Sequence, residues 1–277
     1  MKYAICNETF DGWDHERICR FVAELGYRGL EVAPYTLASR ITDVSPARRR
    51  LLREQAEAAG IEIIGLHWLL ARTEGLHLTS PDKDVRERTA AYLVELARCC
   101  HDLGGEILVF GSPAQRQIPK GRAKTDALEY AADTFRRAMP EIAANGVHLC
   151  LEPLTALETD FINTCGEASD LLDRIGHPNF LLHLDVKAMA SEEIPTPELI
   201  RRHISRTGHF HANDSNKRGP GFGAIDFVPI VKALKRGAYQ GWISVEVFDY
   251  TPDPETIARQ SIRYLRECES KASGSLT

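Results

Sequence analysis

The seven cysteines of this 277-residue chain show no C-x-x-C spacing, and their number is odd. A disulfide-stabilised scaffold pairs its cysteines, and a zinc finger needs closely spaced ligand pairs. The absence of both patterns argues against these two classes of protein. It indicates reduced thiols, as in a cytoplasmic protein.

Long apolar runs and an excess of basic residues are also missing. No stretch approaches the roughly 18 residues of a membrane span, and the opening MKYAIC lacks the features of a signal peptide. Lys and Arg number 34 against 39 Asp and Glu, which gives a formal charge of −5. We therefore expect a cytoplasmic protein whose partner is neither a membrane nor a nucleic acid, since nucleic-acid binding usually leaves a basic footprint.

No low-complexity tract and no long linker divides the chain. α/β barrels commonly occupy roughly 200–250 residues as one domain. We therefore expect one domain over residues 1–270, followed by a disordered tail, residues 271–277, with the sequence KASGSLT.

Short β-rich runs alternate with longer segments of helical periodicity. The expected strands are Lys2–Cys6, Gly29–Val32, Ile61–His67, Ile107–Phe110, Val147–Glu152, Phe180–Asp185, Gly208–Ala212 and Trp242–Val247. The expected helices are Asp14–Leu25, Pro46–Ala59, Asp82–Leu103, Thr125–Ala144, Gly166–Ile175, Thr196–Arg206, Ile225–Arg236 and Pro254–Cys268. Eight such units predict the α/β class and a single closed (β/α)₈ TIM barrel. A doubly wound open sheet is the alternative, and the lack of a G-x-G-x-x-G motif after the first strand disfavours it.

Glycines punctuate the ends of the expected helices. We expect each to take the left-handed conformation that ends a helix. They are Gly26, Gly60, Gly104, Gly146, Gly176 and Gly237.

Each of the last four strands ends in a potential ligand for a hard metal ion: Glu152, Asp185, His211 and Glu246. The spacings are 33, 26 and 35 residues, about one βα unit each, so the four groups recur at equivalent positions of the barrel. Reactive groups of this fold lie at the carboxyl ends of the strands. Capping does not readily account for four such groups in register, and converging carboxylates repel one another unless a cation lies between them. The pattern predicts a bound divalent metal, Mn²⁺ in first place, with Mg²⁺, Co²⁺ or Zn²⁺ as alternatives.

Four motifs resemble the xylose-isomerase-like barrel superfamily, in particular the sugar isomerases and epimerases that include D-tagatose and D-allulose 3-epimerases. The resemblance covers the whole chain and is strongest from Leu151 to Tyr250. The motifs are LEPLTALETDFINT (Leu151–Thr164), LHLDVKAM (Leu182–Met189), HFHANDSNKRGPGFGAIDF (His209–Phe227) and GWISVEVF (Gly241–Phe248).

The resemblance implies that the same four side chains bind one metal and that Glu152 and Glu246 also move protons on opposite faces of a keto-sugar. Removal of a proton next to a carbonyl gives an enediolate, which a chelating metal stabilises. Return of the proton to the other face inverts the carbon, and return to the neighbouring carbon isomerises the sugar. We therefore expect a metal-dependent sugar epimerase or isomerase with a small-molecule sugar as its partner.

One position departs from the ketose epimerases, which usually carry a histidine three residues after the strand-six aspartate. Here Ala188 takes that place, and Lys187 before it either donates to a substrate oxygen or faces solvent. The departure makes a 3-keto-glycoside a serious alternative to a free ketose. Related barrels that cleave 3-keto-C-glycosides begin with the same enolisation, so a lyase is a second interpretation.

Other residues carry two interpretations each. Glu158 either contacts the substrate or is a loop acid, and His67 either donates to a sugar hydroxyl or is a packed core histidine. Trp68 is an apolar wall for a sugar or a core residue. Of Lys217 and Arg218, one is expected to reach the site, and the alternative is a solvated loop charge.

Further side chains are expected to support the site rather than to react. Asn213 and Asp214 are expected to orient His211, His209 to lie behind it, and Cys150 to lie too deep for a nucleophile. The basic segment 116–124 is expected to form a long loop.

Two rival functions remain. An apurinic-endonuclease-like nuclease shares the barrel, but its additional zinc-binding histidines are missing, since strand four ends in FGSP and position 188 is alanine. A non-catalytic binding protein would be expected to lose ligands, and all four are present. The sequence leaves open whether the barrel forms a homo-oligomer.

Overall fold

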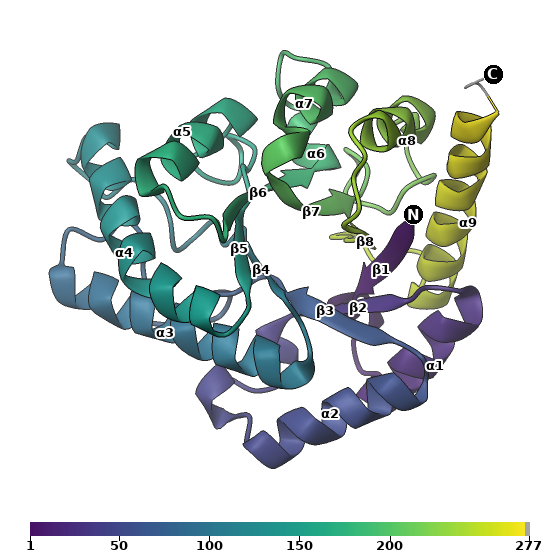
Figure 1. Ribbon diagram of the computed structural model, residues 1–277, viewed down its shortest axis with the longest axis horizontal. Coiled ribbons are helices and arrows are strands. Elements are labelled where there is room, and N and C mark those ends of the chain that lie inside the picture. Colours follow the sequence, from purple (N-terminus) through teal and green to yellow (C-terminus); the bar gives the residue numbers. More distant parts are fainter. Residues whose placement is uncertain (275–277) are drawn as a thin grey trace.

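A computed structural model, which describes residues 1–274, shows a closed barrel of eight parallel strands in chain order (Figure 1). The last strand pairs with the first, so the barrel has no open edge. The predicted TIM barrel is thereby confirmed. The strands are β1 (Lys2–Cys6), β2 (Gly29–Val32), β3 (Glu62–Leu66), β4 (Ile107–Phe110), β5 (His148–Leu151), β6 (Phe180–Asp185), β7 (Thr207–Ala212) and β8 (Trp242–Val245).

The helices surround this barrel (Figure 1). They are α1 (His15–Leu25), α2 (Pro46–Ala58), α3 (Lys83–Leu103), α4 (Lys124–Ala144), α5 (Cys165–Ile175), α6 (Val186–Met189), α7 (Thr196–His203), α8 (Phe227–Arg236) and α9 (Pro254–Ser273). Short 3₁₀ segments add η1 (Asn7–Phe10), η2 (Pro34–Thr36), η3 (Ile41–Asp43) and η4 (Ile204–Arg206). The one-turn helix α6 was not predicted, and α9 extends past Cys268 to Ser273. Of the expected tail, residues 275–277 lie outside the described residues.

The glycine stops hold at every predicted position except the one after α8 (Phe227–Arg236). Gly26, Gly60, Gly104, Gly146 and Gly176 have positive φ. Gly237 does not: its φ is −78°, and the following Ala238 takes the left-handed conformation with φ 52°. The prediction was wrong there because the chain reverses one residue later, where an alanine bears the backbone strain that a glycine would avoid.

Two apolar layers hold the barrel together. The larger one lies between the outward-facing strand residues and the surrounding helices. The smaller one fills the interior of the barrel with Ala4, Ile64, Ile107, Val109, Cys150 and Trp242. Because strand side chains alternate faces, the next inward position after Cys150 is Glu152, two residues further on, so the inward face becomes charged at the carboxyl end of β5.

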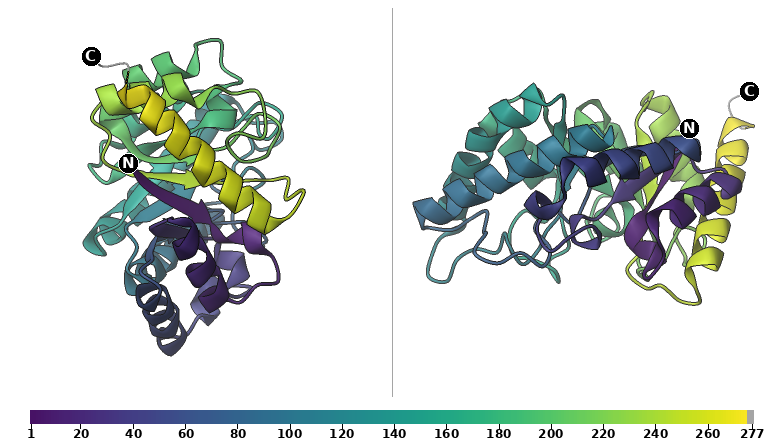
Figure 2. Two further views of the ribbon diagram at one scale, coloured as in Figure 1. Left: turned by 90° about the vertical axis from the view of Figure 1, so that its right-hand side faces the viewer. Right: turned by 90° about the horizontal axis from the view of Figure 1, so that it is seen from below.

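The last helix closes the ring of helices by packing between α8 and α1 (Figure 2). The amino group of Met1 donates to Glu269 Oε1 at 2.9 Å, so the start of β1 is tied to α9.

Within residues 1–274, none of the helices combines the length and the apolar character needed to cross a bilayer.

Gly65 of β3 tests how tightly the barrel is packed. A Cβ at this position would lie 2.2 Å from the backbone oxygen of Ile107 in β4. We expect Gly65→Ala to lower the free energy of unfolding by about 1–3 kcal/mol, as overpacking does, in a urea titration followed by circular dichroism. Gly166→Ala, in the exposed first turn of α5 with only Thr164 Oγ1 nearby at 3.7 Å, is the matched control and should not destabilise. Equal losses in the two variants would contradict the packing argument.

Candidate functional site

The carboxyl ends of β5 to β8 bring the four candidate ligands together. Glu152 follows β5, Asp185 ends β6, His211 lies in β7 and Glu246 follows β8, and all four are buried. Glu152, Asp185 and His211 each offer a ligand atom within 4.8 Å of the others. Glu246 joins them through its Oε2, which lies 3.0 Å from His211 Nδ1.

Three carboxyl groups lie close together here, and their pKa values shift in different directions. Burial, and then the carboxylates of Glu246 and Asp185, raise the pKa of Glu152 well above its usual value. Burial also raises the pKa of Asp185, although Lys187 opposes the shift. For Glu246, the effect of burial is outweighed by the His211 imidazole, which lowers the pKa. Two neighbouring carboxyls with pKa values displaced in opposite directions are suited to acid–base chemistry.

Asp185 is held from two sides. Its Oδ1 accepts from the backbone N–H of Ala188 at 2.7 Å, which caps α6, and its Oδ2 accepts from Asn213 Nδ2 at 2.5 Å. The Oδ1 of Asn213 in turn accepts from the backbone N–H of Lys187. Asn213 therefore orients Asp185 rather than His211, and Asp214 instead accepts from Ser215 and Ile225. The expectation for these two residues was wrong, because Asn213 bonds across to β6 and the start of α6, and Asp214 bonds within the loop after β7.

His211 is oriented by a residue that the sequence did not single out. Glu31, on the inner face of β2, is fully buried and lies 3.1 Å from His211 Nε2 and 2.9 Å from His209 Nε2. Burial opposes ionisation of Glu31, but the two imidazoles lower its pKa well below the usual value. With Nε2 facing Glu31, the Nδ1 of His211 is directed toward Glu246. The same inward parity that identified Glu152 would have identified Glu31, had it been applied to the first strands as well.

A second pair of buried groups supports the opposite wall. His67, directly after β3, places its Nε2 2.9 Å from Oε2 of Glu8, a residue of η1 that the sequence did not indicate. Burial lowers and the Cys6 and Glu8 side chains raise the pKa of His67, and the net shift is well above the usual value. His67 is completely buried, with its Nδ1 3.7 Å from Glu31 Oε1.

His183 is another interior histidine that the sequence did not single out. It precedes Asp185 by two residues on the same face of β6 and is fully buried. Its ring packs edge-on against that of His211, with centroids 4.2 Å apart. Burial, together with the neighbouring His211 and His209, lowers its pKa well below the usual value, so the imidazole is neutral.

The mouth of the site is a cavity lined by carboxylates and rings: His67, Trp68, Val109, Gly111, Pro113, Glu152, Leu154, Glu158, Glu246 and Phe248. Trp68 donates from Nε1 to Glu246 Oε1 at 2.9 Å. Lys187 Nζ donates to Glu158 Oε1 at 2.7 Å and lies 4.3 Å from the centre of the Phe248 ring. Lys187 is only 9% exposed, and both of these contacts are with residues of the cavity lining, so the side chain lies behind the cavity wall and not in the solvent.

Arg116 fixes the backbone beneath Glu152. It is fully buried and donates from Nη1 to the carbonyl of Glu152 at 2.7 Å and from Nη2 to that of Ile162 at 3.1 Å. The segment 116–124, expected as a long basic loop, thus begins with a residue that is part of the structure of the site.

The two basic residues of the loop after β7 lie differently from Lys187. Lys217 is exposed, and Arg218 pairs with Asp249 at 2.9 Å and donates to Thr251. Neither residue is among those that line the cavity within residues 1–274.

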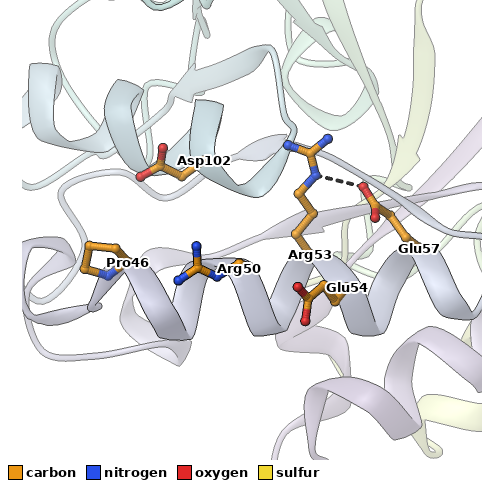
Figure 3. A pocket seen from close by; sticks show the side chains of 6 residues that line it. All are labelled: Pro46, Arg50, Arg53, Glu54, Glu57 and Asp102. Carbon is orange, nitrogen blue, oxygen red and sulfur yellow. Dashed lines mark hydrogen bonds and ion pairs between the residues drawn. The ribbon is translucent and has the colours of Figure 1, made fainter.

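One hollow on the outer surface does not share this chemistry. It lies between α2 and the end of α3, where side chains of both charge signs line it: Arg50, Arg53, Glu54, Glu57 and Asp102 (Figure 3). Arg53 is paired with Glu57 of its own helix at 2.8 Å. Exposed pairs of this kind contribute little to stability and assemble no reactive group.

Known proteins with the same fold match most of the chain. The family model of the xylose isomerase-like TIM barrel matches residues 19–268. The D-psicose 3-epimerase of Ruminiclostridium cellulolyticum is 30% identical over 250 residues, which cover 89% of this chain and 82% of that protein.

Solved structures agree. D-psicose 3-epimerase with D-tagatose from Clostridium cellulolyticum H10 has a TM-score of 0.79 and 25% identity, with 100% of this chain and 97% of that chain covered. The 3-keto-D-glucoside 4-epimerase from E. coli has a TM-score of 0.84 and 20% identity, with 97% and 100% covered, and shows a likeness of fold. The resemblance inferred from the four sequence motifs is confirmed: the chain belongs to the xylose isomerase-like TIM barrel family.

Proposed function

We propose that this protein is a divalent-metal-dependent epimerase or isomerase of keto-sugars. One observation carries the proposal: two buried carboxylates, Glu152 and Glu246, line the same cavity beside Asp185 and His211. The names of the relatives, which are ketose and keto-glucoside epimerases, support the same class of reaction.

The residues present suit a divalent cation. Three carboxylates and one imidazole form a donor set that Mn²⁺, Mg²⁺, Co²⁺ or Zn²⁺ accepts. Their mutual repulsion, expressed in the raised pKa of Glu152, is what a cation among them would relieve. When bound there, the cation would supply stabilisation of the negative charge that develops on the substrate oxygens.

The protein's own part is the movement of one proton. One of the two glutamates removes the proton from the carbon next to the carbonyl; the electron pair of that C–H bond forms a C=C bond, and the π pair of the C=O bond moves onto the oxygen. The other glutamate returns a proton to the opposite face of the same carbon, and the stereocentre is inverted. The hydrogen bonds from Trp68 to Glu246 and from Arg116 to the backbone of Glu152 hold the pair in position.

The walls of the cavity would bind the sugar. We assign Glu158 and Lys187 to polar contacts with its hydroxyls, because Glu158 lines the cavity and Lys187 is bonded to it. Trp68 offers a flat apolar face, and His67 a donor beside it. Lys217 and Arg218 would need new side-chain positions to reach the same substrate.

The residues after Asp185 bear on which keto-sugar is the substrate. Ala188, preceded by Lys187, stands where ketose epimerases usually carry a histidine three residues after the aspartate. A 3-keto-glycoside is therefore proposed beside a free ketose, and cleavage of a 3-keto-C-glycoside is the outcome if the enediolate expels its substituent instead of taking up a proton.

Solvent exchange tests the proposal. Incubated in D₂O with Mn²⁺, the protein should incorporate deuterium next to the carbonyl of a ketose or a 3-keto-glucoside, as mapped by NMR. Glu152→Gln and Glu246→Gln should each lower the exchange rate at least about 100-fold, since general acid–base catalysis contributes roughly 10²–10⁴-fold. Glu62→Gln, an exposed glutamate at the opposite end of β3, is the matched control and should exchange normally. No exchange with either type of keto-sugar would refute the proposal.

Gly111→Ala tests the position of Glu152 without removing a charge. An added Cβ would lie 1.6 Å from Glu152 Oε2, so the carboxylate must move. We expect a folded protein, judged by its circular dichroism spectrum, whose exchange rate falls at least about tenfold, since small displacements of a catalytic group are costly. An unchanged rate would show that Glu152 need not occupy its present position.

Lys187→Met tests the cationic contact. Loss of a hydrogen bond to a charged group costs about 1.5–3 kcal/mol, so KM should rise roughly tenfold or more while kcat changes much less. Lys187→Arg should restore part of the affinity, and Lys217→Met should have the smaller effect because that side chain is exposed. The assignment fails if Lys217→Met raises KM more than Lys187→Met does.

A further inference from the structure

We infer that His183 is a fifth protein donor of the metal centre, which adds a second imidazole to the set of three carboxylates and one imidazole. The inference rests on the proposed function, because it assumes that a metal binds among Glu152, Asp185, His211 and Glu246.

Both ring nitrogens of His183 lack a hydrogen-bond partner in the part of the chain that the structure describes. The side chain is fully buried, and buried polar atoms without a partner are rare because each costs about 1–3 kcal/mol. His209 and His211, in contrast, each direct a nitrogen at the carboxylate of Glu31. The imidazole of His183 therefore carries a free lone pair inside the barrel.

That lone pair lies among the other candidate ligands. One nitrogen of His183, one of His211 and one carboxylate oxygen each of Glu152 and Asp185 all lie within 4.8 Å of one another. The residue is on the same face of β6 as Asp185, one alternation below it, so it approaches the cluster from the interior of the barrel. Within residues 1–274, this group contains three of the four sequence-derived ligands and one further residue, which is His183.

A second imidazole changes which metal the site prefers. Carboxylate and carbonyl oxygens suit Mg²⁺ and Mn²⁺, whereas imidazole suits Zn²⁺, Co²⁺, Ni²⁺ and Fe²⁺. A centre of three carboxylates and two imidazoles should therefore favour Co²⁺ or Zn²⁺ over Mn²⁺ more strongly than a centre with one imidazole. Ring packing alone, the simplest other role for His183, predicts no such dependence.

Two variants separate ligation from packing. His183→Phe keeps a flat ring against His211 but has no donor, and His183→Leu removes the ring as well. Protein stripped with a chelator and dialysed would be titrated with Zn²⁺, Co²⁺ and Mn²⁺ in competition with a chromogenic chelator, and the visible absorption of the Co²⁺ form recorded. Loss of an outer-shell partner alone typically costs 10–100-fold in metal affinity. We therefore expect both variants to lose at least about 100-fold for Zn²⁺ and Co²⁺, less for Mn²⁺, and to shift the Co²⁺ bands.

Cys150→Ala is the matched control. Cys150 lies on the inner face of the neighbouring strand and belongs to none of the candidate ligand groups of residues 1–274, so its removal should leave metal affinity unchanged. Thermal unfolding of the metal-free variants at His183 should show no loss of stability, because the substitution removes polar atoms that lack partners.

The outcomes distinguish the two proposals. Tight binding by the wild type with unchanged affinities and Co²⁺ spectra in both variants overturns the role of His183 and leaves the proposed function standing. No metal binding by the wild type overturns the metal centre itself. If one variant does not fold, the other carries the comparison, and metal affinity is read without any substrate.

Discussion

Repulsion among buried carboxylates is the constraint on which the rest of the site depends. Glu152, Asp185 and Glu246 converge at one end of the barrel, where little water reaches them. Burial and mutual proximity disfavour the charged forms, and the pKa values of Glu152 and Asp185 are raised as a result. An arrangement of this kind is stable only with compensating positive charge, and the surrounding side chains supply part of it.

The side chains that compensate the negative charge lie at two levels of the barrel, below the carboxylates and near the mouth. Below the carboxylates, imidazoles share the buried charge of Glu31, and His211 also lowers the pKa of Glu246. At the mouth, Lys187 opposes the rise in the pKa of Asp185 and bonds to Glu158. A divalent cation would complete the balance, and His183, with its unpartnered nitrogens, lies where such a cation would bind.

The same geometry suits proton transfer. Two carboxyls whose pKa values move in opposite directions can act as base and acid in turn, and hydrogen bonds from Trp68 and Arg116 restrict where each of them lies. One departure from the pattern of the ketose epimerases lies in α6, where the buried Lys187 precedes Ala188. Substrate choice within a common reaction is therefore expected to depend on this short helix, which was not predicted from the sequence.

The sequence by itself determined the barrel and the four candidate ligands. Alternation of strands and helices is a local property, and Glu152, Asp185, His211 and Glu246 recur at equivalent strand ends, so both could be read from spacing. Strand parity also placed His209 and Cys150 in the interior. The left-handed residue after α8 was misplaced by one position, because the exact residue at which a helix unwinds depends on its packing.

Only the tertiary structure decided which groups meet across the barrel. Glu31 in β2 contacts a residue 180 positions away in the chain. The corresponding separations are 59 positions for Glu8 in η1 and 36 for Arg116 in the loop after β4. No local pattern encodes such contacts, because closure of the sheet brings distant strands face to face. The lack of hydrogen-bond partners for His183 is likewise a property of its surroundings, because it depends on the positions of all the side chains around the ring.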